Sequence, residues 1–72
     1  MNALNIKLST KEAAIIGDAL MDAAIALRTN HMTDVVMSEE KFLNSDISTA
    51  RRERYLALTS RANELRDFVR LS

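Results

Sequence analysis

Arginine side chains dominate the chemistry available to the C-terminal third of this chain. The segment TARRERYLALTSR, residues 49–61, places Arg51, Arg54 and Arg61 around the chain's single tyrosine, Tyr55. A guanidinium group offers a planar set of N–H donors that matches a carboxylate or a phosphate, and arginine suits interfaces better than lysine does. Arg54 and Arg61 are seven residues apart, so a helix would carry both on one face. We therefore predict four partner-binding residues: Arg51, Arg54, Arg61 and Tyr55.

The residue pattern leaves three kinds of anionic partner open for these arginines. They are the acidic residues of another subunit, an acidic group on a target protein, and a phosphate-bearing ligand such as a nucleotide. A simpler alternative is that the arginine stems cover the edge of the core while their charged ends stay in water. Nucleic acid is a further alternative, but the chain has zero formal net charge, one tyrosine and no tryptophan. Binding to single strands normally uses several aromatic side chains, so general DNA binding is not expected.

Catalytic and metal-binding motifs are missing from the sequence. The chain has no cysteine, one glycine and one histidine, and it contains no Gly-rich phosphate loop, nucleophile–histidine–acid set or zinc motif. Asp18 and Asp22 are four residues apart, but dinuclear sites in helical bundles also need Glu-x-x-His pairs. We expect a protein that is not an enzyme and binds neither a cofactor nor a metal.

Chain length and composition favour a small protein that self-associates. The 72 residues form one domain, 1–72, and a domain of this size buries too little surface to be very stable alone. Without cysteine, its stability must come from good helix packing or from oligomerisation. No signal-peptide pattern is evident. The longest weakly polar run, Ala13–Leu27, is shorter than the roughly 20 residues of a membrane span. We expect a cytoplasmic protein with no membrane contact.

A first long helix is predicted over residues 10–29. Ser9 and Glu12 have the spacing of a capping box, in which each side chain accepts a hydrogen bond from the other residue's backbone N–H. Before this helix, Leu4, Ile6 and Leu8 alternate with polar residues, which indicates a short N-terminal strand.

The predicted first helix is apolar around most of its circumference. Its main apolar side combines Ile16, Leu20, Ala23 and Leu27, with Ala13, Gly17 and Ala24 beside them. Ala13 and Gly17 are four residues apart and would let another backbone come close. Further apolar residues flank a narrow polar stripe on the opposite side, and one partner helix cannot cover such a surface. We therefore predict an interface with further copies of the chain, formed by Ile15, Gly17, Met21 and Ile25.

The middle of the chain, residues 30–46, is predicted to be a loop that contains one short helical turn. Ser38 is a suitable N-cap for the sequence EEKFL, and Asn44 is a suitable residue to end it. The connection is long for a simple helical hairpin, in which 2–8 residues are usual. The loop is therefore either a folded excursion or a mobile functional segment.

A second long helix is predicted over residues 47–71. Apolar residues recur there at spacings of three and four: Tyr55, Leu58, Ala62, Leu65 and Val69. This pattern is typical of a helix that packs at a shallow angle on another helix. Three further arginines fall on the opposite side, where we expect them to be solvated: Arg52, Arg66 and Arg70.

The order of these segments resembles small accessory proteins that bacteriophages encode. The matching sequences are LNIKLSTKEAAIIGDALMDA and RRERYLALTSRANELRDFV, which together cover most of the chain. The resemblance implies a host-interaction protein in the host cytoplasm, such as an inhibitor or a protein that sequesters host defence signals. It transfers no active-site residue.

The sequence as a whole predicts an all-α protein. Two long antiparallel helices form a helical hairpin, and two or more copies associate into a helical bundle, most simply a dimer with four long helices. The predicted function is a non-enzymatic, self-associating binding protein that occupies or inhibits a host protein. The alternative is a protein that sequesters a phosphate or nucleotide ligand, or a nucleic-acid-binding module, through the arginines of the second helix.

Overall fold

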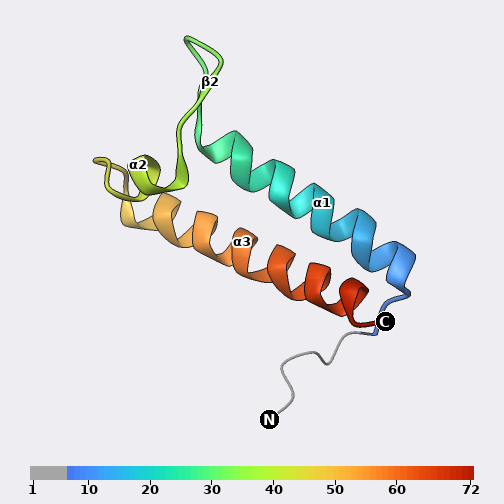
Figure 1. Cartoon of the computed structure of the whole chain (residues 1–72). Helices are drawn as coiled ribbons and strands as arrows, with labels where there is room; N and C mark the ends of the chain where they lie inside the picture. Colours follow the sequence, from blue (N-terminus) through green and yellow to red (C-terminus); the bar gives the residue numbers. More distant parts are fainter. Residues whose placement is uncertain (1–6) are drawn as a thin grey trace.

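Two long helices lie side by side and antiparallel in the computed structural model of the chain, which describes residues 7–72 (Figure 1). α1 spans Thr10–Leu27 and α3 spans Thr49–Arg70. Between them the chain forms strands β1 (Thr29–Asn30) and β2 (Val35–Val36) and the short helix α2 (Glu39–Leu43). The predicted helical hairpin and the predicted helical turn at EEKFL are therefore confirmed, whereas the β-ribbon was not predicted.

Serine residues immediately precede the three helices that lie within residues 7–72. Ser9 and Glu12 form the predicted capping box, with both backbone-to-side-chain hydrogen bonds at 3.1 Å. The bonds to Ser9 hold the pKa of the Glu12 carboxyl below its ordinary value, because they favour the charged form. Ser38 and Ser48 accept hydrogen bonds from the backbone N–H groups of Lys41 and Arg51 in the same way. Each cap supplies an acceptor to a first-turn N–H that lacks a partner within its helix.

Small residues form the face of α1 that packs against α3. Ala13, Gly17 and Ala24 are buried, whereas Ile16 remains 39% exposed. The predicted position of Ile16 on the covered side of this helix is therefore wrong. A Cβ atom added at Gly17 would lie 3.4 Å from the Cβ atom of Leu65, so the two helices are close at this point. Small side chains permit this approach. With this face turned inward, Ile15 and Ile16 point away from α3.

The seam of α3 follows the predicted spacing. Tyr55, Ala62 and Leu65 are buried, and Leu58 and Val69 are half-buried. Near the start of α3, Tyr55 joins Ala24 and Phe42 in a core cluster that fastens α2 to the long helices. The Phe42 and Tyr55 rings are tilted by 53° with their centroids 4.9 Å apart, a favourable aromatic arrangement.

The β-ribbon projects away from the long helices (Figure 1). Its strands pair Thr29 with Val36 and Asn30 with Val35. The turn is held by Asn30, whose Oδ1 accepts from the Met32 N–H at 2.9 Å and whose carbonyl accepts from the Asp34 N–H at 2.7 Å. Asp34 has φ 55°, a left-handed conformation that Asp tolerates better than most residues. Because Thr29 and Asn30 enter this ribbon, α1 ends before the predicted boundary.

The predicted N-terminal strand lies mostly outside the described residues. Leu8, the one member of its pattern within them, is in a bend and not in a strand. Among the helices of residues 7–72, none is long and apolar enough to cross a membrane. Association into a larger bundle stays a prediction.

We predict that Gly17→Ala raises the free energy of unfolding by about 0.5–1 kcal/mol. The added methyl group would meet Leu65 at contact distance, and alanine has the higher helix propensity. Gly17→Leu should instead lower the free energy of unfolding by about 1–3 kcal/mol, because the larger side chain would force the helices apart. Urea denaturation followed by circular dichroism measures both. A clear loss of stability in Gly17→Ala would show that α1 and α3 leave no room for a methyl group.

Candidate binding surfaces

Two arginines donate hydrogen bonds to backbone carbonyls at the C-terminal ends of α1 and α2. The Nη2 atom of Arg51 donates to the Leu27 carbonyl at 3.2 Å, and that of Arg52 donates to the carbonyls of Leu43 at 3.0 Å and Ser45 at 3.5 Å. Carbonyls at a helix C-terminus lack partners within the helix, so these guanidinium groups satisfy them. Arg52 is half-buried, and the prediction that it is simply solvated is wrong.

Tyr55 is a core residue. It is 2% exposed, and its hydroxyl donates to Glu39 Oε1 at 2.7 Å. Arg28 lies across its ring, with the guanidinium carbon 5.8 Å from the ring centroid. Burial removes Tyr55 from the surface that a partner could contact, which corrects that part of the sequence-based prediction. The ring instead connects α2, the end of α1 and the start of α3.

The surroundings of Tyr55 favour its neutral phenol. Burial raises the pKa of the Tyr55 hydroxyl above its ordinary value of 10.0, and the hydrogen bond to Glu39 raises it further. The positive charge of Arg28 acts in the opposite direction but does not outweigh these two effects. The proton is therefore held where it donates to the Glu39 carboxylate.

All three predicted partner-binding arginines are exposed. Arg51 donates to the Leu27 carbonyl, whereas within residues 7–72 no backbone carbonyl accepts from Arg54 or Arg61. Arg61 Nη1 lies 3.6 Å from Glu64 Oε1, an exposed pair within one helix that adds little stability. Within residues 7–72, no hydrogen bond or ion pair engages the Arg54 guanidinium. These two side chains can therefore bind an external anion at little cost to the fold.

Arg54 borders a hollow between the end of α1 and the first turns of α3. The hollow has a volume of about 280 Å³ and is lined by Leu27, Ser48, Ala50, Arg51 and Arg54. The sequence predicted both arginines as binding residues, and the structure brings them to one cavity. Leu27 and Ser48 were not predicted there, because nothing in a local pattern shows that these helix ends meet.

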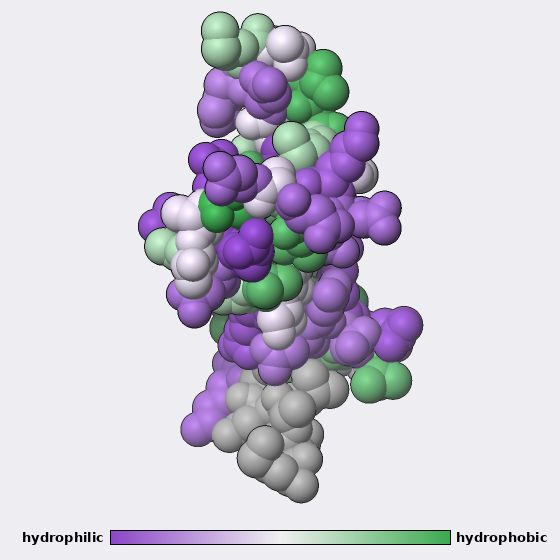
Figure 2. All heavy atoms as spheres, turned by 90° about the vertical axis from the view of Figure 1, so that its left-hand side faces the viewer, coloured by the Kyte–Doolittle hydropathy of each residue, from purple (hydrophilic) through white to green (hydrophobic). Residues whose placement is uncertain are grey.

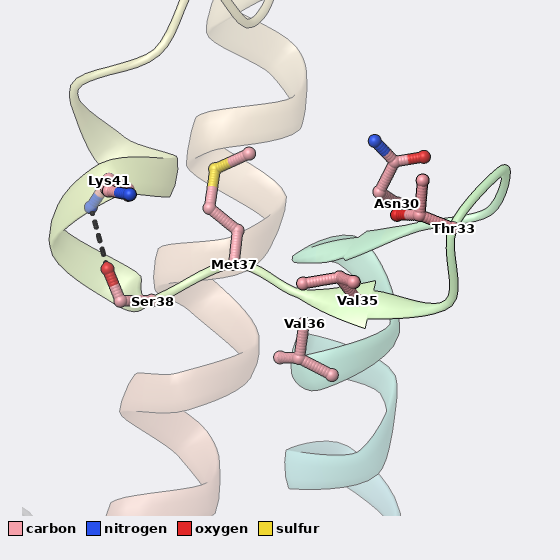
Figure 3. Close-up of a pocket in the computed structure, with 7 residues that line it drawn as sticks. All are labelled: Asn30, Thr33, Val35, Val36, Met37, Ser38 and Lys41. Atoms are coloured by element: carbon pink, nitrogen blue, oxygen red, sulfur yellow. Dashed lines mark hydrogen bonds between the residues drawn. The ribbon is translucent and has the colours of Figure 1, made fainter.

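The β-ribbon carries a second, more apolar hollow of about 450 Å³. Figure 3 shows its lining: Asn30, Thr33, Val35, Val36, Met37, Ser38 and Lys41. The tip beside it is mixed: Met32 is 94% exposed, and its neighbours His31, Thr33 and Asp34 are exposed polar residues. Figure 2 views the molecule from this end, with hydrophobic residues at the top among hydrophilic ones. Sequence reasoning missed this surface because it predicted no ribbon.

The predicted oligomer-interface residues lie in different environments. Ile15 is 61% exposed, and Met21 and Ile25 are half-buried. Gly17 is buried against α3 of its own chain, so its close packing is used within the hairpin. The exposed surface of α1 includes four charged residues, Lys11, Glu12, Asp18 and Asp22, together with two isoleucines and three alanines. We call these apolar residues the outer apolar face: Ile15, Ile16, Ala19, Ala23 and Ala26.

The described part of the chain contains no group of three or more His, Cys, Asp or Glu residues that could hold a metal ion. Comparison of the chain with protein-family models, with curated proteins and with solved structures finds no match.

We predict that Arg52→Ala lowers the free energy of unfolding by about 1–2 kcal/mol, whereas Arg54→Ala changes it by less than about 0.5 kcal/mol. Arg52 makes charge-assisted hydrogen bonds to two carbonyls, and the loss of such bonds is costly. Arg54 is an exposed residue without such contacts. Urea denaturation of the two variants measures the difference. Equal stabilities would show that the Arg52 hydrogen bonds do not stabilise the α2–α3 connection.

Spectrophotometric titration should show a raised pKa for Tyr55. The chain has one tyrosine and no tryptophan, so the phenolate absorbance reports on this residue alone. We expect its midpoint above 10 in the folded protein and near 10 in urea. Since the folded-state pKa is the higher one, the stability linked to Tyr55 is present below pH 10 and is lost as the pH rises through the folded-state value. Tyr55→Phe should remove this alkaline loss. A folded-state midpoint at or below 10 would contradict the burial of the hydroxyl.

Proposed function

We propose that this protein is a non-enzymatic, self-associating helical binding protein that occupies a protein partner. The observation that carries the proposal is the outer apolar face of α1, which α3 leaves uncovered. Ile15 is 61% exposed and Ile16 is 39% exposed on this face. Burial of such residues at an interface removes apolar surface from water and favours association.

The composition of the outer apolar face suits a closely packed helix. Ile16, Ala19, Ala23 and Ala26 recur at spacings of three, four and three. A helix that packs at a shallow angle requires such spacing. Alanine side chains are short, so they allow another helix to approach. We propose a second copy of the chain as the occupant of this face, which gives a bundle of four long helices.

The target protein is proposed to contact two exposed arginines of α3, Arg54 and Arg61. Arg54 and Arg61 are seven residues apart, or about 10 Å along the helix axis. The side chains of Arg54 and Arg61 can bind an acidic group on a target without loss of any core contact. The resemblance to bacteriophage accessory proteins supports a host protein as this target. Acidic side chains opposite such arginines would speed association and select the partner.

Native mass spectrometry of the full chain, purified from the cells that naturally produce it, tests both contacts. We expect a dimer that also retains a protein at fixed stoichiometry. Ile15→Glu should raise the dimer dissociation constant at least tenfold, because it places a charge in the apolar interface. Leu56→Glu is the matched control, since Leu56 is an exposed leucine of α3 outside the outer apolar face. A wild-type monomer at micromolar concentration would contradict self-association.

The target contact needs a separate comparison of arginine variants. Removing both Arg54 and Arg61 by alanine substitution should release the retained protein without dissociating the dimer. Arg66→Ala is the matched control, because Arg66 is another exposed arginine of α3 and pairs with Asp18 of its own chain at 3.8 Å. Unchanged retention by the double variant would exclude these arginines as the target-binding residues.

A further inference from the structure

The hollow between the end of α1 and the start of α3 has the chemistry of an oxyanion site. Its lining contains two arginines, one serine and two apolar residues, and no aspartate or glutamate. We propose that this hollow binds a small oxyanion, a phosphate monoester or a carboxylate, between Arg51 and Arg54. The inference does not depend on the proposed function, because the hollow and both of its arginines belong to a single copy of the chain.

The two guanidinium groups are suited to different tasks in this site. Arg51 uses one donor for the Leu27 carbonyl, which fixes its position and leaves other N–H groups for a ligand. Arg54 is exposed, and no acceptor within residues 7–72 engages it. Arg51 therefore supplies N–H donors at a fixed position, and Arg54 supplies donors that can move to contact the anion. Paired N–H groups of this kind match the oxygens of phosphate and carboxylate.

The helix ends themselves contribute little net attraction. The start of α3 carries a partial positive charge, but the end of α1 beside it carries a partial negative charge. Because the Leu27 carbonyl belongs to that negative end, the Arg51 hydrogen bond offsets part of its repulsion of an anion. The attraction of the site for an anion therefore depends on the two guanidinium groups, and loss of Arg54 should weaken anion binding.

A third arginine lies in an adjoining hollow. This second hollow, of about 180 Å³, shares Leu27 and Arg51 with the first, and it is lined by Arg28 and by no acidic residue. The Arg28 Nε atom is buried, and no acceptor in the described part of the chain reaches it. Arg28 therefore extends the positive charge around Arg51.

Cavity size and lining limit the ligand. A volume of about 280 Å³ is just below the range of about 300–1,000 Å³ that is common for small-molecule sites. The hollow accordingly takes one oxyanion and a small attached group. Leu27 and Ala50 would contact the apolar part of that group, while Ser48 adds a hydroxyl at the border.

Titration of the ¹⁵N-labelled full chain with inorganic phosphate, followed by NMR at constant ionic strength, tests this site. We expect saturable shifts, with millimolar affinity, at the backbone amides of Thr49 and Ala50 and at the Arg54 Nε–H group. Arg54→Gln should weaken binding at least fivefold, while the matched control Arg66→Gln leaves it unchanged. Shifts that do not saturate, or that persist in Arg54→Gln, would overturn the proposal.

Further probes separate the two sources of the oxyanion. Acetate and adenosine monophosphate are titrated under the same conditions, with chloride as the control for ionic strength. Tighter binding of either phosphate compound than of acetate would identify a phosphate site. If acetate binds as tightly as the phosphate compounds, and its binding is also lost in Arg54→Gln, the hollow is a carboxylate site. Equal responses to chloride and to all three probes would reject a specific oxyanion site, whatever the outcome of the oligomer experiment.

Discussion

The close approach of α1 and α3 at Gly17 is the contact on which the rest of the structure depends. A glycine beside Leu65 lets two helices meet where larger side chains would hold them apart. The same contact selects the small-residue face of α1 as the inner one, so Ile15 and Ile16 are left outside. It also aligns the helices along their axes, which brings Leu27 to the level of Arg51. The exposure of the outer apolar face is thus a consequence of this packing.

Arginine has two different functions in this small chain. Arg51 and Arg52 satisfy carbonyls at the ends of α1 and α2, and so replace part of the packing that a short chain cannot supply. The Arg52 hydrogen bonds and the packing of Phe42 on Tyr55 together hold α2. A helix of only five residues is not stable alone. Arg54 and Arg61 have no comparable task within the hairpin. Fold stability therefore does not account for their presence near an uncovered apolar surface.

Local patterns predicted much of the fold, whereas contacts between distant residues were not predictable. The caps at Ser9 and Ser38 and the spacing of Tyr55, Ala62 and Leu65 are encoded within a few residues. The inward face of α1 is encoded only in part. The pattern places Ala13, Gly17 and Ala24 beside the main apolar side, but a hydrophobicity ranking puts isoleucine above glycine, and close packing reverses that order. The ribbon has strands of two residues, too short for a recognisable alternation. Arg52 faces inward only because the Leu43 and Ser45 carbonyls lie within its reach, which no helical wheel can show.

The two proposed sites are adjacent, and this proximity has a thermodynamic consequence. Leu27, which lines the oxyanion hollow, follows Ile16 and Ala23 along one side of α1 at spacings of seven and four residues. A second copy on the outer apolar face would therefore lie near Arg54. If that copy presents an acidic residue to Arg54, the residue competes with a small oxyanion for the guanidinium group. If the copy covers the hollow without such a residue, it shields the bound anion from water and strengthens the attraction between the anion and the arginines. In either case the coupling is reciprocal, so the anion must change the affinity between copies by the same factor as the second copy changes the affinity for the anion.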